Sequence, residues 1–181
     1  MKYSDKELLE MMKIPEKRDY VFNHIINSYQ EQTYWHIRKI LISHEDSNDV
    51  TQNTFIKVFE NLRKFKGESK IFTWIYRIAT NESLSFLKKK KKFFFQSLDS
   101  VSVSLKKNLE SDIYFDGTQA EKKLQQAILS LPLRQRIAFN MKYFDKMKYE
   151  EISDVLGTSI GALKANYHHA QNKIKEFLKS N

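Results

Sequence analysis

The chain has 181 residues, 41% of them hydrophobic and 29% charged, which is enough for one ordinary globular domain or two small ones. The absence of cysteine excludes disulfides and thiolate zinc sites, and four glycines and two prolines are too few for a turn-rich β-sandwich or barrel. The net charge of +9 gathers in residues 61–95 and 121–181, which indicates a polyanion such as nucleic acid as the partner, the alternative being a solvated face that only keeps the protein soluble.

Residues 1–19 contain no apolar stretch that resembles a signal peptide. No run in the chain approaches the ~18 apolar residues that are needed to span a bilayer. We therefore expect a soluble intracellular protein.

Apolar residues at three- and four-residue spacing predict a first helix over residues 20–41. A second helix is predicted to begin near "HEDSNDV", residues 44–50, and to run to residue 62. The residues suited to its cap and first turn are Asp46, Ser47 and Asp49.

Gly67 breaks this helical pattern, and a third helix is predicted to start after Glu68, with Ser69 as its N-cap. It runs into "KKKKKFFF", Lys88 to Phe95, where lysines at a helix C-terminus suit its dipole and can follow phosphates. Three consecutive phenylalanines cannot all face one way, so at least one packs on a partner or across the domain. Together these segments predict a helical domain over residues 1–95.

Residues 96–117 hold five serines and show no sustained helical period. We predict a flexible linker over 96–119, with an extended part that needs a partner to become ordered. Helical spacing resumes at Ala120, and Pro132 opens the next helix, where its missing N–H costs nothing. A second helical domain is predicted over 120–181.

The stretch "YEEISDVLGTSIGALKANYHHAQNKIKEFL" has the layout of a helix-turn-helix, with Gly157 at the turn and Thr158 or Ser159 as the cap of the second helix. One stripe of that helix is apolar: Ile160, Leu163, Tyr167, Ala170, Ile174 and Phe177. The opposite face carries small and hydrogen-bonding residues: Ser159, Gly161, Ala162, Lys164, Ala165, His168 and His169. Such residues can approach base edges in a major groove. The alternative is a helical hairpin with an ordinary solvated face.

No catalytic, metal or cofactor site is predicted. Neighbouring residues on a helix point about 100° apart, so His168 and His169 cannot chelate one ion together. The acidic cluster of Glu45, Asp46 and Asp49 lies at a helix start, where capping and the helix dipole explain it. An enzyme and a membrane-surface or scaffolding protein are therefore the less favoured classes.

The stretch "FKGESKIFTWIYRIATN", residues 65–81, combines aromatic and basic side chains with a glycine loop. Aromatic faces compensate for lost base stacking by about 1–3 kcal/mol per base, and a glycine loop lets backbone approach a base turned out of the stack. The stripe of Ile71, Ile75 and Ile78 is predicted to face the core. Tyr76 and Arg77 lie off this stripe and Trp74 at its edge, so we expect them to face a nucleic-acid strand, the alternative being plain core packing.

With these motifs in view, the chain resembles the extracytoplasmic-function (group IV) sigma factors of bacterial RNA polymerase, in the sigma-70 family. "SNDVTQNTFIKVFENLRKFKGESKIFTWIYRIATNESLSFLKKK" is similar to the family's region 2, and "LPLRQRIAFNMKYFDKMKYEEISDVLGTSIGALKANYHHAQNKI" to its region 4. The resemblance covers roughly residues 20–92 and 120–177. It implies an all-α fold of two small helical domains, the second with a helix-turn-helix.

The resemblance also implies residue roles. Docking on the clamp coiled coil of the polymerase falls to Asp49, Gln52, Asn53 and Phe55. Capture of a base flipped out of the −10 element falls to a loop and two residues lining its pocket: Phe65, Lys66, Gly67, Glu68, Ser69, Ile78 and Asn81. The melted −10 strand is held by Thr73, Trp74, Tyr76 and Arg77, to which we add Lys88 of the lysine run. The −35 element is read by Lys164, Ala165, His168 and His169, to which we add Ser159.

Two departures from the family pattern stand out. Asn53 replaces the usual acidic residue of the docking helix, which removes one charge toward a basic partner. On the −35 face the usual arginine-rich pattern is thinned by Ala165, Asn166 and Gln171.

The expected function is therefore promoter-specific transcription initiation without catalysis by this chain. The implied partners are core polymerase (clamp coiled coil and flap), promoter DNA and an anti-sigma factor, with no small-molecule substrate. We expect a bacterial cytoplasmic protein, held at the inner membrane where its anti-sigma factor is membrane-bound. The alternative is a stand-alone helix-turn-helix regulator that binds DNA without polymerase, its first domain serving as a sensor or dimeriser.

Overall fold

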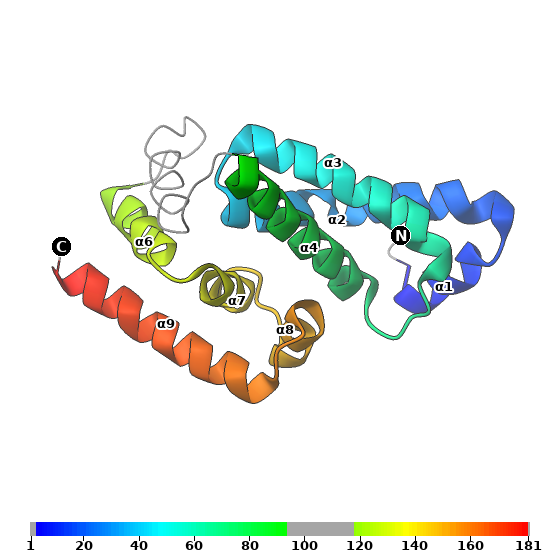
Figure 1. Cartoon of the computed structure of the whole chain (residues 1–181). Coiled ribbons are helices and arrows are strands. Elements are labelled where there is room, and N and C mark those ends of the chain that lie inside the picture. Colours follow the sequence, from blue (N-terminus) through cyan, green and yellow to red (C-terminus); the bar gives the residue numbers. More distant parts are fainter. Residues whose placement is uncertain (1–2, 94–117, 181) are drawn as a thin grey trace.

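The computed structural model describes residues 3–93 and 118–180, and every regular element within these two ranges is a helix (Figure 1). The all-α prediction is confirmed. The first half contains α1 (Asp5–Met12), a 3-10 turn (Pro15–Lys17), α2 (Arg18–Leu41), α3 (His44–Asn61), a second 3-10 turn (Leu62–Lys64) and α4 (Ile71–Phe93). The second half contains α6 (Gln119–Leu129), α7 (Leu133–Tyr143), α8 (Tyr149–Leu156) and α9 (Ile160–Ser180).

Helix α1 was not predicted from the sequence, although the signal for it is present. Ser4 and Glu7 form a capping box, in which the Ser4 side chain accepts from the Glu7 N–H and the Glu7 carboxylate accepts from the Ser4 N–H at 2.7 Å. The helix then serves as a cap for α4, because the Asp5 carboxylate accepts from the Ile71 N–H at 2.9 Å. The prediction that Ser69 caps this helix is therefore wrong, since the cap comes from a distant segment.

Helix α3 begins at His44, within the stretch predicted for its start, but its cap is a residue that was not predicted. Its N-cap is Ser43, whose hydroxyl accepts from the Asp46 N–H at 3.3 Å, and Glu45 and Asp46 occupy the first turn. The acidic residues thus act through the helix dipole rather than as the cap.

Each half has a core of its own. In the first half, α1 to α4 close around the first-half core: Leu8, Val21, Ile25, Phe55, Val58, Leu62, Ile71 and Ile75. In the second half, α6, α7 and α9 close around the second-half core: Ala127, Ile128, Leu131, Phe139, Ala170 and Ile174. Pro132 lies at the N-cap of α7, one position before the first helical residue.

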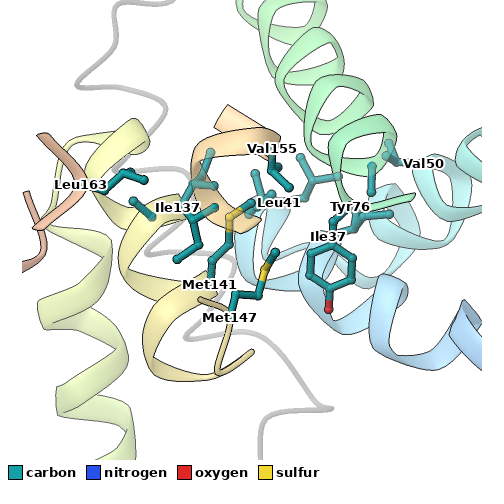
Figure 2. Close-up of a cluster of buried hydrophobic side chains, with 13 residues drawn as sticks. Ile37, Leu41, Val50, Tyr76, Ile137, Met141, Met147, Val155 and Leu163 are labelled. Atoms are coloured by element: carbon teal, nitrogen blue, oxygen red, sulfur yellow. The ribbon is translucent and has the colours of Figure 1, made fainter. Parts of the chain in front are cut away.

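A third group of buried side chains, the shared core, joins the two halves (Figure 2). The first half supplies Ile37, Ile40, Leu41, Val50, Tyr76 and Ala79 to it, and the second half supplies Ile137, Ala138, Met141, Met147, Ile152, Val155 and Leu163. Helices α7 and α8 therefore lie between α4 and α9, and α9 forms the outer edge (Figure 1). The sequence did not predict this direct packing. The division into 1–95, 96–119 and 120–181 stays a prediction, and residues 96–117 of the predicted linker lie outside the described residues.

Candidate nucleic-acid interface

The conformation of the loop between the second 3-10 turn and α4 depends on Gly67, which no other amino acid could replace without strain. Gly67 has φ +75°, and a Cβ atom there would come within 2.6 Å of Leu9 Cδ1 on α1. The left-handed backbone costs other residues about 1–2 kcal/mol, and the close contact adds to this. Lys66 and Glu68 stay exposed on either side, so α1 supports the loop from below and leaves its charged residues in solvent.

The two aromatic residues at the ends of this loop stack on each other. The rings of Phe65 and Trp74 have centroids 4.7 Å apart and planes 28° apart, and both residues are partly buried against the first-half core. The stack joins the loop to the first turn of α4. One face of each ring is therefore already occupied by the other ring.

The expectation that Tyr76 is displayed is wrong in this arrangement. Tyr76 is only 2% exposed and belongs to the shared core, with its ring 4.1 Å from Phe72 and 4.3 Å from His36. Its hydroxyl donates to the Gln32 carbonyl at 3.2 Å, and burial raises the pKa of the phenol. Thr73 is equally buried, so neither side chain can reach a strand in this arrangement.

The remaining residues of the predicted α4 face differ in their access. Arg77 and Ile78 are partly buried, with Ile78 packed against the first-half core, whereas Asn81 and Lys88 are exposed. Ile71 and Ile75 are fully buried, which confirms two of the three predicted core positions. Asn81 lines a cavity of about 290 Å³ whose other walls include Arg134 on α7, Leu156 on α8 and Asn166 on α9.

The predicted docking residues lie on α3, three of them in solvent. Asp49, Gln52 and Asn53 are exposed, whereas Phe55 is 7% exposed and part of the first-half core. A groove of about 980 Å³ runs between α2 and α3 beside them, and Trp35 lines it from α2. This face therefore offers polar side chains on α3 next to an apolar groove.

Helix α9 matches its prediction closely. Gly157 has φ +61° at the turn, and the Ser159 hydroxyl caps α9 by accepting from the Ala162 N–H at 3.3 Å. The predicted apolar stripe is buried or partly buried along its whole length. The predicted DNA-facing residues are all exposed: Ser159, Gly161, Ala162, Lys164, Ala165, His168 and His169.

Neither a metal site nor a membrane span emerges from residues 3–93 and 118–180. Within these ranges no three His, Cys, Asp or Glu side chains gather in a way that could hold an ion. His168 instead meets the Asn172 amide at 3.1 Å. Among the same residues, no helix is long and apolar enough to cross a bilayer.

Comparison of the sequence with protein-family models agrees with the arrangement of helices described above. The family model for Sigma-70 region 2 matches residues 25–93, and that for Sigma-70 region 4 matches residues 121–174. The chain belongs to the sigma-70 family. As a sigma factor it binds core RNA polymerase and promoter DNA and directs promoter-specific initiation. The match to region 2 decides against the stand-alone regulator, and members of this family are initiation factors rather than enzymes.

Full-length relatives place this sigma factor in the extracytoplasmic-function group. It is 28% identical over 167 residues to the ECF RNA polymerase sigma factor SigW of Bacillus subtilis, covering 87% of this chain and 89% of that protein. It is 26% identical over 190 residues to the RNA polymerase sigma-H factor of Pseudomonas aeruginosa, covering 96% and 93%.

Solved structures share the fold. The sigma factor RpoE of Bartonella quintana, in complex with the anti-sigma factor NepR, has a TM-score of 0.68 at 18% identity, over 87% of this chain and 96% of that one. CnrH, in complex with the cytosolic domain of CnrY, has a TM-score of 0.68 at 17% identity, over 98% of each chain. At such identities the likeness supports the arrangement of helices alone.

Proposed function

We propose a division of labour along this sigma factor. Helix α3 docks on the clamp coiled coil of core polymerase, the loop at 65–69 with α4 captures and holds the melted −10 strand, and α9 reads the −35 element. The flap of the polymerase is the second contact on the enzyme, through region 4. The observation that carries the proposal is that region 2 precedes region 4 in the chain, as in the family, and that α9 has a buried apolar stripe on one side and an exposed polar face on the other.

The α3 and α9 assignments are supported by access to solvent. Asp49, Gln52 and Asn53 project from α3 into solvent, where a basic partner can meet them. On α9, Lys164 and the exposed N-terminal turn favour phosphate, and the small residues beside them allow close approach to base edges.

The −10 assignment is supported by the loop geometry. Gly67 gives the left-handed turn, Lys66 offers a cation for phosphate, and the stacked pair of Phe65 and Trp74 offers aromatic faces at its base. Thr73 and Tyr76 join this site only if the packing around α4 changes, because both are buried here.

An anti-sigma factor is part of the proposal. The solved RpoE and CnrH structures are complexes, the first with the anti-sigma factor NepR and the second with the cytosolic domain of CnrY. By likeness of fold, we propose a regulator of the same kind for this chain, with the sigma factor in the cytoplasm and brought to the inner membrane where that regulator is membrane-bound.

Run-off transcription on genomic fragments with core polymerase tests the function directly. Adding the protein should produce new start sites, and a complete lack of them would refute the proposal. On a promoter found in this way, Phe65→Ala or Asn81→Ala should reduce open-complex formation more than formation of the initial closed complex. Lys175→Ala, an exposed change on α9 outside the predicted contacts, is the control. Equal loss of both steps would contradict a flipped-base pocket in the loop.

A further inference from the structure

Region 4 covers the side of α4 that holds part of the predicted −10 site. Tyr76 and Ala79 of α4 belong to the shared core, in which Figure 2 labels Tyr76. Asn81 lines the cavity between α4 and α7 to α9. At the start of α4, Lys70 pairs with Glu151 of α8 at 2.8 Å. The same surface cannot hold a DNA strand and region 4 at once.

A buried polar group ties the two regions together. Asp145, which follows α7, places one carboxylate oxygen 3.2 Å from His36 Nδ1 and pairs the other with Lys39, both on α2. The side chains of His36 and Asp145 are 1% and 5% exposed. Lys39 also lies over the ring of Phe144 at 5.4 Å, so region 4 surrounds this cation on two sides.

Hydrogen bonds on both ring nitrogens hold His36 between α4 and region 4. The Asp145 carboxylate can only accept, so Nδ1 must donate to it. The Thr80 hydroxyl lies 2.7 Å from the Tyr76 carbonyl and 2.9 Å from His36 Nε2, so a hydrogen bond joins the imidazole of α2 to α4. The imidazole stacks on Tyr76 with centroids 4.3 Å apart and faces the carboxylate of Asp145.

The C-terminal end of α2 supplies a second anchor. The last carbonyls of a helix have no partner within it and attract cations. Here Arg136 of α7 donates to the Ile40 carbonyl at 3.2 Å, and the Asn140 amide donates to the Lys39 carbonyl at 3.5 Å. Burial lowers the pKa of Arg136 to about 10, which still leaves it charged at neutral pH.

We propose that His36, Lys39 and Asp145 form an intrachain latch that holds the free protein in a closed state in which region 4 blocks α4, and that the latch must open before α4 can hold the −10 strand. This inference rests on the proposed function. Buried ion pairs add little net stability compared with apolar packing, but losing one partner leaves an uncompensated buried charge. The latch therefore selects one closed geometry, and a partner that binds the open form better shifts the population toward it.

Distance measurement tests the closed state. Because the natural chain lacks cysteine, Glu60→Cys on α3 and Lys175→Cys on α9, both exposed, can carry two spin labels. The free protein should give one narrow distance, and Asp145→Asn should move the ratio of open to closed protein at least tenfold toward open. Asp154→Asn, which removes the same charge from the exposed face of α8, should leave the distribution unchanged.

Two results would overturn the latch. One is a broad distance distribution in the unmodified sequence, and the other is a narrow distribution that survives Asp145→Asn while helical circular dichroism is retained. If Asp145→Asn loses its helical signal, Lys39→Gln replaces it, because this partly exposed position removes one cation of the latch and leaves Asp145 in place.

A reversible lock tests the consequence for transcription. Lys70→Cys and Glu151→Cys, joined by a reducible bis-maleimide, should abolish open-complex formation with core polymerase, and reduction should restore it. The control joins Lys175→Cys to Lys179→Cys within α9 and should have no effect. Full activity of the locked protein would overturn the proposal. Inactivity of both the locked and the reduced protein, with an inactive unmodified chain, would instead refute the proposed function.

Discussion

Helices α4 and α9 both carry predicted DNA contacts, and both follow a glycine with positive φ, yet they are packed in opposite ways. Helix α9 buries one stripe, including Leu163, Ala170 and Ile174, and leaves its opposite face in solvent. Helix α4 buries two faces, with Ile75 in the first-half core and Tyr76 in the shared core. A helix that is packed on one side can expose a binding face on the other side. A helix that is packed on two sides can expose such a face only after the helices on one side have moved away.

Because of this difference, the face predicted to bind the −35 element is more accessible than the face predicted to bind the −10 element. The −35 face of α9 is open in the closed protein, whereas part of the −10 face of α4 is covered by region 4. Changes in α4 should therefore alter stability and closure together with DNA binding. Changes on the open face of α9 should alter DNA binding alone.

The largest expected effect follows from truncating Tyr76. Tyr76→Ala should lower the free energy of unfolding by about 3–5 kcal/mol, because it removes a ring buried between Phe72 and His36 and leaves a cavity in the shared core. Tyr76→Phe keeps the ring and loses only the hydrogen bond to the Gln32 carbonyl, so we expect about 1 kcal/mol. Urea unfolding followed by circular dichroism measures both.

His169→Ala on α9 is the comparison for Tyr76. His169 is exposed, so its loss should change stability by no more than about 0.5 kcal/mol. A small effect of Tyr76→Ala, similar to that of His169→Ala, would show that α4 is not enclosed in solution.

The same contrast explains what the sequence could and could not predict. The stripe of α9 was predictable because a single helical period separates its buried and exposed residues. On α4 the isoleucine stripe marked one buried face, but Tyr76 lies off that stripe and is buried in a core to which both halves contribute. His36 and Asp145 are in contact but lie 109 residues apart in the sequence, so no local sequence pattern could have predicted this contact. Helix α1 could have been found from the capping box at Ser4, whereas its support of Gly67 through Leu9 could not.

The latch predicts a pH-dependent contribution of Asp145 to stability. Burial alone would raise the pKa of this carboxyl, but the hydrogen bonds and charges of His36 and Lys39 outweigh it, and the pKa lies below its ordinary value of 3.8. A lowered carboxyl pKa stabilises the folded protein above the ordinary value, and this stability is lost as pH falls through the folded value. Tyr76 and Thr80 of α4 complete the surroundings and carry no opposing positive charge.

We therefore expect Asp145→Asn to lower the free energy of unfolding by about 3 kcal/mol at pH 7. In urea unfolding, the difference in unfolding free energy between Asp145→Asn and the unmodified protein should stay constant at pH values where the Asp145 carboxyl is ionised in both the folded and the unfolded protein. The difference should become smaller as the pH drops below about 4. Asp154→Asn should give a small gap at every pH. A gap for Asp145→Asn that stays constant down to the acid-unfolding limit would contradict a role for the ionised carboxylate.

The two turn glycines offer a smaller contrast. Gly67→Ala meets both a left-handed backbone and the Leu9 side chain at 2.6 Å, whereas Gly157→Ala meets a left-handed backbone with no atom within 4 Å. We expect a loss of about 1 kcal/mol for Gly157→Ala and about 2 kcal/mol for Gly67→Ala in urea unfolding. In a Leu9→Ala background the steric part of the Gly67→Ala effect should disappear while the backbone part remains. Equal losses at both glycines, unaffected by Leu9→Ala, would mean that α1 does not press on the loop.

The smallest stability effect is expected on the open face of α9. Lys164 is exposed and lies 5.9 Å from the ring of Tyr149, a contact worth about 0.5 kcal/mol at such a site, so Lys164→Ala should hardly change unfolding. If Lys164 neutralises one phosphate of the −35 element, its loss should reduce the slope of log affinity against log salt concentration by about 1. The holoenzyme on a promoter found by run-off transcription gives this slope, with Lys175→Ala as the charge-matched control. Because α9 is open in the closed protein, the slope change should also persist when the Lys70→Cys and Glu151→Cys lock is applied to the free protein on −35 duplex DNA. A slope change that vanished on locking would mean that the closed state covers α9 as well as α4, and the contrast between the two helices would fail.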